Sequence, residues 1–228
     1  MTQFSDMNDR TDARARGANS GPDAEHTPAR ERDFGPTRPR VADAPVEGSA
    51  ASLGAADAPL NPFLVAAEEF IRQGNLAGAL GELGRALDEH PDDVSILCAR
   101  ASLYLHQQRL EPAEADLRRA SKLDPGNPEV LFGLGTLFCK KARWREAIEP
   151  LQRVVELDPM RASGHYYLGE AYNQTDQLKP ALGSYEAAVR LEPNNWRALK
   201  GVGIVLDKMG RPTEATVAYQ KAREAQRR

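Results

Sequence analysis

The chain has 228 residues, and its 30 Lys and Arg against 33 Asp and Glu give a formal net charge of −3. Nucleic-acid binding needs a basic patch or stripe, so we expect no nucleic-acid partner. No apolar run approaches the roughly 20 residues of a membrane span, and the N-terminus lacks the apolar stretch of a signal peptide. Cys98 and Cys139 are too few for a disulfide framework. We therefore expect a cytoplasmic protein with reduced thiols and no membrane span.

Residues 1–58 differ in composition from the rest of the chain. They are rich in Asp, Arg, Ala, Gly, Ser and Pro, contain no Lys, Trp or Tyr, and their few apolar residues follow neither a helical nor a strand period. Such a segment cannot bury enough apolar surface to offset an ordering entropy of roughly 1–2 kcal/mol per residue. We expect residues 1–58 to form a disordered tail and residues 59–228 to form the folded domain.

From residue 60 onward a motif recurs every 34 residues. The stretch "KLDPGNPEVLFGLG" from Lys122 returns as "ELDPMRASGHYYLG" from Glu156 and as "RLEPNNWRALKGVG" from Arg190. If the proline of the acid–Pro pair is placed at position 32, the chain divides into five units, about 60–93, 94–127, 128–161, 162–195 and 196–228. A fixed period of this length is typical of repeat architectures.

Small and large residues occupy fixed positions in these units. Position 8 is Ala or Gly, position 20 is always Ala, and position 27 is Ala or Val, whereas positions 11 and 24 are bulky. Positions 4, 7, 8 and 11 share one face of a helix with about 3.6 residues per turn, as do positions 20, 24 and 27. Each unit is therefore predicted to be two amphipathic helices whose axes approach closely at the small residues.

The ends of the predicted helices also carry signals. The acid–Pro pair should end each second helix, because proline cannot donate a backbone hydrogen bond, and Asn127 should cap the next helix, with Pro128 at its first position. Pro150 lies inside a predicted helix and should kink it. Position 30 is expected to pack on a following helix, and it is leucine in three units: Leu123, Leu157 and Leu191. Unit five has Ala225 there and Arg223 at position 28, so we expect a solvated cap with no catalytic domain beyond it.

The 34-residue period, with small and large residues at positions 8, 11, 20, 24, 27 and 32, resembles the tetratricopeptide repeat family over about residues 60–228. The resemblance implies an all-α fold, a right-handed α-solenoid of about five helix pairs, and a scaffold that binds other proteins. The chain departs from the family pattern in two places. Position 4 is never Trp, and Arg227 stands where unit five would have its proline.

The signals for catalysis or cofactor binding are weak. The stretches "GLGTLF" and "GVGIVL" lack the third glycine of a dinucleotide motif and follow no strand, so we interpret both as helix packing. No pair of histidines has zinc spacing on a helix. His106 and Cys139 lie on neighbouring predicted helices and could form a nucleophile and base, but no orienting third residue is evident. We expect no cofactor, no metal and no enzymatic activity, and an enzyme using Cys139 and His106 is the least favoured alternative.

The resemblance places a partner-binding groove at positions 2, 5, 9, 12 and 13 of each first helix. The candidate groove residues are Leu64, Glu68, Cys98, Ser102, His106, Phe132, Thr136, Tyr166, Glu170, Asn173 and Lys200. Positions 12 and 13 also add Arg72, Lys140, Gln174 and Lys208. Phe132 and Tyr166 are aromatic at positions that the core does not need, as expected of interface anchors. The alternative is that these residues form only a solvated face.

Some family members clamp the C-terminal carboxylate of a partner with Lys at position 5 and Asn at position 9 of the first unit. Leu64 and Glu68 occupy these positions, so we expect that clamp to be absent. The function we expect is an adaptor that holds an extended or helical segment of a protein partner in the groove, as a monomer or weak homo-oligomer. The alternative is a chaperone for a secreted or assembly substrate.

Overall fold

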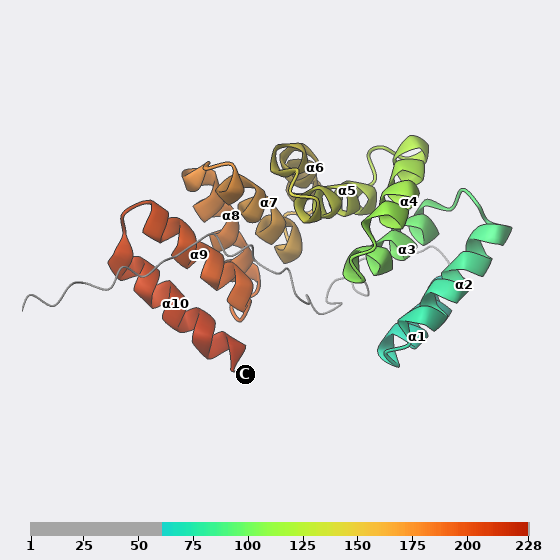
Figure 1. Ribbon diagram of the computed structural model, residues 1–228, viewed down its shortest axis with the longest axis horizontal. Helices are drawn as coiled ribbons and strands as arrows, with labels where there is room; N and C mark the ends of the chain where they lie inside the picture. The colour runs from blue at the N-terminus through green and yellow to red at the C-terminus, as the bar shows by residue number, and fades with distance from the viewer. Residues whose placement is uncertain (1–60, 228) are drawn as a thin grey trace, which may run out of the picture. The chain divides into compact units, whose positions relative to one another are not determined.

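The structure of the protein, a computed structural model, describes residues 61–227 and contains ten α-helices and no strand in that range (Figure 1). The helices are α1 (Pro62–Arg72), α2 (Leu76–Glu89), α3 (Val94–His106), α4 (Leu110–Leu123), α5 (Pro128–Lys140), α6 (Trp144–Leu157), α7 (Ala162–Gln174), α8 (Leu178–Leu191), α9 (Trp196–Lys208) and α10 (Pro212–Gln226). The all-α prediction is confirmed. The expected tail of residues 1–58 lies outside the described residues, so its disorder and its boundary with the repeats stay predictions.

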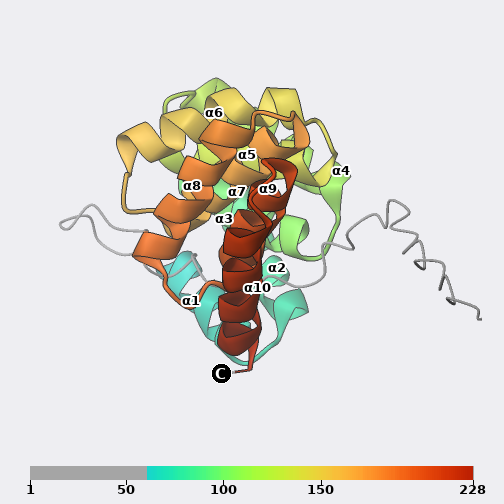
Figure 2. The ribbon, with the colours of Figure 1, turned by 90° about the vertical axis from the view of Figure 1, so that its left-hand side faces the viewer.

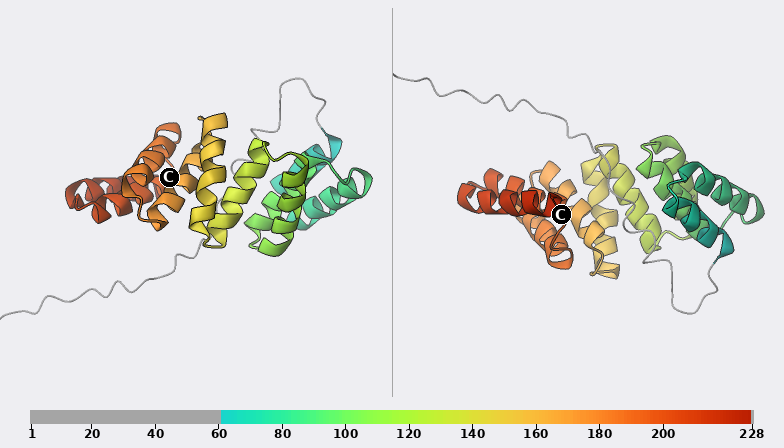
Figure 3. Two further views of the ribbon diagram at one scale, coloured as in Figure 1. Left: turned by 90° about the horizontal axis from the view of Figure 1, so that it is seen from above. Right: turned by 90° about the horizontal axis from the view of Figure 1, so that it is seen from below.

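The helices stack in chain order as five pairs. Each helix packs against the next along the chain, and in addition α3 packs against α5, α5 against α7, and α7 against α9. Among the described helices, no even-numbered helix packs to a similar extent against the next even-numbered one. Figure 2 looks along the stack with α10 in front, and Figure 3 shows from two sides that chain order and spatial order agree. The first helices therefore line one side of a helical solenoid, and we call this side the inner face.

Glycines at position 8 let the two helices of a unit approach closely. A Cβ added at Gly169 would lie 2.8 Å from Cδ1 of Tyr185, and one added at Gly203 would lie 2.6 Å from Cε1 of Tyr219. Such distances are well inside the 3.5–4.0 Å at which carbon atoms attract best. The residue at position 24 thus fills the space that the missing side chain leaves, as the small–large pattern predicts.

Position 6 provides the second wall for the same side chain. A Cβ added at Gly201 in α9 would lie 2.6 Å from Cε1 of Tyr185, and one added at Gly133 in α5 would collide with Leu117. Tyr185 is therefore enclosed between α7 of its own unit and α9 of the next, and only 4% of it is exposed. The glycines in "GLGTLF" and "GVGIVL" serve helix packing, as expected.

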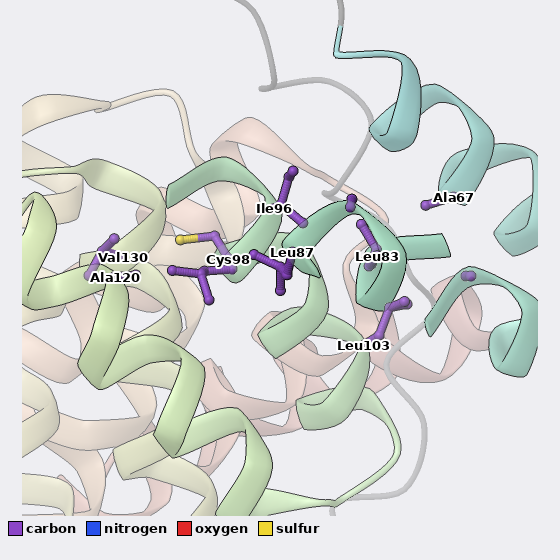
Figure 4. Close-up of a cluster of buried hydrophobic side chains, with 11 residues drawn as sticks. Ala67, Leu83, Leu87, Ile96, Cys98, Leu103, Ala120 and Val130 are labelled. Carbon is purple, nitrogen blue, oxygen red and sulfur yellow. The ribbon is translucent and has the colours of Figure 1, made fainter. Parts of the chain in front are cut away.

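The largest N-terminal core cluster joins residues from five helices (Figure 4). Ala67 of α1 meets Leu83 of α2, and Ile96 and Cys98 of α3 continue the cluster toward Val130 of α5. Leu83, Ile96 and Val130 are almost fully buried. The core is thus continuous from one unit to the next, because a single helix pair cannot bury its own apolar face.

In every unit, one residue in the left-handed backbone conformation lies in the turn between the two helices. Position 15 has a positive φ in all five units: Gly74 (72°), Gln108 (59°), Ala142 (57°), Asp176 (56°) and Gly210 (73°). Only two of the five are glycine, the residue that adopts this conformation without steric cost. The turn geometry is therefore imposed by the packing of the two helices, and three units carry a strained residue to achieve it.

The joints between units follow the predicted chemistry in part. The side-chain oxygen of Asn127 accepts a hydrogen bond from the amide of Glu129 at 2.9 Å, and Pro128 is at the first position of α5, as expected. The helix α6 continues through Pro150 to Leu157. The kink expected at Pro150 stays a prediction.

The expectation for position 30 is wrong in two units. Leu123 and Leu157 are 44% and 49% exposed. Each is the last residue of its helix, where the chain turns away toward the acid–Pro pair.

Candidate partner-binding site

The predicted groove residues of the first two units contribute mainly to the core. Leu64 packs against the N-terminal core cluster and Cys98 is a buried member of it. Burial, with smaller effects from carboxylates such as Glu129, raises the pKa of the Cys98 thiol to about 12. Glu68 is half-buried and Ser102 is exposed. The polar groups that this half of the inner face offers to a partner include those of Glu68, Ser102 and His106.

The inner face of α5 and α7 carries an aromatic cluster. The rings of Tyr166 and Tyr167 lie edge to face with centroids 5.2 Å apart, and Phe132 meets Tyr167 in the same manner at 5.9 Å. Tyr166 also contacts the ring of Tyr185 at 6.0 Å. Phe132 and Tyr166 are thus brought together, as a shared site requires, but both pack partly against the core. The expectation that the core does not need them is wrong for this part of their surface.

Arg161 covers one face of Phe132. Its guanidinium lies 4.0 Å from the ring centroid, and it forms a bidentate ion pair with Glu129 at 2.7 and 2.9 Å. Arg161 occupies the position where Asp93, Asn127 and Asn195 cap the other first helices, and α7 has no side-chain cap. The cap of α7 is thus replaced by a contact that fixes the aromatic cluster.

Glu170 lies in the centre of the inner face of α7, one turn after Tyr166. It is half-buried and makes no hydrogen bond or ion pair within the part of the chain that the structure describes. Burial raises the pKa of Glu170 to about 7, although Lys140 and Arg197 act in the opposite direction. A carboxyl group in this environment changes charge near neutral pH.

Thr136 of α5 and Asn173 of α7 add buried polar atoms to the candidate site. Each residue is 6% exposed. Thr136 Oγ1 and Asn173 Oδ1 have no hydrogen-bond partner among the described residues. The backbone carbonyl of Asn173 accepts a hydrogen bond from Lys208 Nζ at 3.2 Å, which links α7 to α9.

Lys140 and Lys200 supply positive charge to the same face. Lys140 is half-buried in the last turn of α5, and burial is the main cause that lowers the pKa of its ammonium group. Lys200 is exposed on α9, one turn after Arg197. Of these cations, Lys140 acts on the carboxyl group of Glu170, as does Arg197 of α9.

The pairing of Cys139 with His106 as nucleophile and base has no support in the geometry. The thiol of Cys139 is buried and lies 3.9 Å from the backbone carbonyl oxygen of Tyr167. Burial is the main cause that raises its pKa far above the ordinary value, whereas a nucleophilic cysteine needs a lowered one. His106 is half-buried at the end of α3. Residues 61–227 also contain no group of three or more His, Cys, Asp or Glu that could hold a metal ion.

Three residues of this face were not among the predicted site residues. Tyr167 connects Phe132 to Tyr166, Arg161 covers Phe132, and Arg197 faces Glu170. A signal existed for Tyr167, since it stands at position 6, where the neighbouring units have glycine. Arg197 is at position 2, which the groove pattern includes. Arg161 breaks the Asp or Asn pattern of the capping position.

Within residues 61–227, no helix has the length and apolar character needed to cross a bilayer. A comparison with the curated proteins gives no match.

Several solved structures are similar in fold. They include the crystal structure of MamA (24% identity, TM-score 0.59, covering 71% of this chain and 94% of that chain). Residues 41 to the end of MamA from Desulfovibrio magneticus RS-1 match at 21% identity with a TM-score of 0.62, covering 73% and 94%. MamA AMB-1 matches at 22% identity with a TM-score of 0.62, covering 72% and 98%. At these identities the similarity concerns the helical solenoid itself.

A family model for the tetratricopeptide repeat matches residues 64–128, 132–188 and 177–227. These segments span the described helices from α1 to α10, and the 34-residue period, the small residues at positions 8 and 20 and the stacked helix pairs agree with the match. The chain belongs to the tetratricopeptide repeat family, whose members are protein-interaction scaffolds.

Proposed function

We propose that this protein is a non-catalytic adaptor that binds an extended or helical segment of a protein partner on its inner face. The observation that carries the proposal is the composition of the inner face of α5, α7 and α9. There an aromatic cluster lies beside a half-buried Glu170, and the buried Thr136 Oγ1 and Asn173 Oδ1 have no hydrogen-bond partner within residues 61–227. Aromatic anchors beside polar groups are typical of the centre of an interface.

The remaining predicted residues extend this surface along the array. Lys200 and Ser102 are exposed on the first helices of units five and two, and Glu68 is half-buried in unit one. A partner segment lying across several units would contact residues of each unit. The binding energy would then be shared among these contacts and would not need a single pocket. We propose that the adaptor works in the cytoplasm, where its two unpaired thiols would stay reduced, as a monomer or weak homo-oligomer.

Affinity purification from an extract of the native cells tests the proposal. Lys200→Glu changes an exposed inner-face residue and should reduce partner recovery at least several-fold, because a charge reversal at an interface introduces repulsion. Tyr166→Ala should do the same if its circular dichroism spectrum and melting temperature show an intact fold. Lys179→Glu changes an exposed residue of α8 and is the matched control. Equal recovery with all three variants would contradict the inner face as the binding surface.

A further inference from the structure

The inner face of α5 holds a donor group that is buried without an acceptor. The hydroxyl of Thr136 is in a residue that is 6% exposed, and it has no hydrogen-bond partner in the described part of the chain. Leaving a buried polar group unpaired costs about 1–3 kcal/mol, and such groups are rare in folded proteins. Thr136 therefore indicates a place where a ligand supplies the missing partner.

Lys140 stands next to this hydroxyl. Residues four apart on a helix are neighbours on its surface, so Lys140 and Thr136 share one face of α5. Lys140 is half-buried and forms neither a hydrogen bond nor an ion pair within residues 61–227. Burial lowers the pKa of its ammonium group first, and Arg197 of α9 lowers it further. An ammonium group desolvated in this way gains from an anionic partner.

The charges around this point favour an anion over a cation. Lys140 of α5 and Arg197 of α9 both act on Glu170 of α7, which lies between these two helices in the stack. Among the described residues, Glu170 is the carboxylate that acts on Lys140, and its negative charge opposes the two cations. With Glu170 ionised, an arriving anion meets a like charge. When Glu170 is neutral, this repulsion is absent and the anion meets only the attraction of Lys140 and Arg197.

Glu170 is poised between these two forms. Burial raises its pKa to about 7 against the effects of Lys140 and Arg197. The other titratable groups that face it are Cys139 of α5, Tyr166 and Tyr167 of α7, and Tyr185 of α8. All four have raised pKa values and are neutral at pH 7. No charged group of α6 is among those that shift Glu170, so its own proton decides the local charge.

We propose that Thr136, Lys140 and Arg197 form a carboxylate site on the inner face, which binds an acidic side chain of the protein partner when Glu170 is neutral. The Thr136 hydroxyl donates one hydrogen bond to the bound carboxylate, and the ammonium group of Lys140 supplies a charge-assisted one. This inference rests on the proposed function, because it assigns the chemistry of the partner on the same surface. Binding at neutral pH takes up a proton from water onto Glu170.

The proton uptake fixes the pH dependence of binding. With a pKa of about 7, Glu170 is neutral in about nine-tenths of the molecules at pH 6 and in about one-tenth at pH 8. The apparent affinity scales with the fraction of the competent form. Binding of a carboxylate is therefore expected to be about tenfold tighter at pH 6 than at pH 8.

The test uses the full-length protein labelled with nitrogen-15 and a capped probe peptide, acetyl-Ala-Ala-Glu-Ala-Ala-amide. We expect saturable shifts of the amides of Thr136, Lys140 and Glu170, with affinity about tenfold higher at pH 6 than at pH 8. The same peptide with Gln in place of Glu should produce no saturable shift. A peptide of five alanines with a free C-terminal carboxylate distinguishes an acidic side chain from a chain end, and tighter binding of that peptide would overturn the assignment to a side chain.

Four variants separate the roles of the residues. Glu170→Gln should bind the probe at pH 8 as tightly as the wild type does at pH 6, with no pH dependence between them. Lys140→Gln should lose at least tenfold in affinity at both pH values, and Thr136→Val should lose several-fold without loss of stability, because it removes an unpaired hydroxyl. Lys179→Gln, on the exposed side of α8, should match the wild type.

The outcomes that overturn the carboxylate site differ from those that overturn the adaptor function. Affinity that is independent of pH, that is tighter at pH 8, or that Glu170→Gln leaves unchanged refutes the carboxylate site. The adaptor proposal survives each of these results if Lys200→Glu still reduces recovery of the native partner at least several-fold. It fails if partner recovery is insensitive to every inner-face variant whose circular dichroism spectrum is intact.

Discussion

The substitution Gly169→Ala tests the packing of the helix pairs, because two opposing effects act on it. Alanine is favoured over glycine in a helix interior by about 1 kcal/mol. Its Cβ, however, would lie 2.8, 3.0 and 3.1 Å from three ring atoms of Tyr185. The ring cannot retreat, because Gly201 of α9 touches its other side and only 4% of Tyr185 is exposed. The two helices must therefore separate.

Overpacking of this kind typically costs about 1–3 kcal/mol. After the gain in helix propensity of about 1 kcal/mol is subtracted, Gly169→Ala should destabilise the array by up to about 2 kcal/mol. The control is Gly183→Ala in α8, where an added Cβ meets no atom within 4 Å. That variant gains helix propensity without a clash and should be stabilised by up to about 1 kcal/mol. The same chemical change is thus expected to have opposite signs at two positions of one unit.

Urea unfolding followed by far-ultraviolet circular dichroism measures both variants. The double variant Gly169→Ala, Tyr185→Leu adds a further check, because Ala67 faces Leu83 in unit one and Ala101 and Leu117 occupy the same positions in unit two. Alanine at position 8 is thus compatible with leucine at position 24, and Tyr185→Leu should remove most of the penalty of Gly169→Ala. If Gly169→Ala is as stable as the wild type, the close contact that defines the repeat register is not what limits this position.

Other predictions concern the turns, the core and the thiols. Ala142→Gly should stabilise the protein by about 0.5 kcal/mol, since Ala142 has a φ of 57°. Gly74→Ala should destabilise the protein by about 1 kcal/mol through backbone strain alone. The midpoints of denaturant unfolding check both predictions. Ala147→Leu, at a position with 0% exposure, should cost about 1–3 kcal/mol or more, and an unchanged melting temperature would contradict the assigned register. Cys98 and Cys139 are buried with raised pKa values, so iodoacetamide at pH 8 should modify the folded protein far more slowly than the urea-unfolded chain.

The helices of this fold were predictable because their signal is repeated. Ala and Gly recur at position 8 and Ala at position 20, so each unit supports the interpretation of the others. The turn at position 15 was not predictable in this way. Gln108, Ala142 and Asp176 give no local sign of a positive φ, because the conformation is imposed by the contact between the two helices.

For the candidate site, the positions of the residues along the helices were predictable from the sequence, but the burial of their side chains was not. The groove pattern identified Phe132, Tyr166 and Glu170, yet how deeply each is buried depends on residues of other units. Arg161 covers Phe132, and Tyr167 fills a place where the neighbouring units have glycine. The raised pKa of Glu170 arises from the same crowding. A single sequence gives the register of these residues, but their desolvation appears only when the units are stacked.

The cost of burying Glu170 provides a further prediction, on the stability of the fold. The pKa of Glu170 is about 7 in the folded protein against an ordinary value of 4.5. Because the folded value is the higher one, the folded state binds more protons between pH 4.5 and 7. Stability should therefore fall as the pH rises through this window and level off above pH 7, by at most about 3 kcal/mol.

Glu170→Gln should remove this dependence, since the amide cannot ionise. The difference in unfolding free energy between the variant and the wild type should grow from pH 5 to pH 7 in favour of the variant, and stay constant from pH 7 to pH 9. Gly183→Ala in α8, which changes no titratable group, should give a flat difference over the same range. A flat difference for Glu170→Gln as well would mean that the carboxyl group is solvated in the folded protein. A carboxylate that destabilises its own fold at neutral pH is not needed for packing, and an acidic partner whose binding neutralises it would recover part of that free energy.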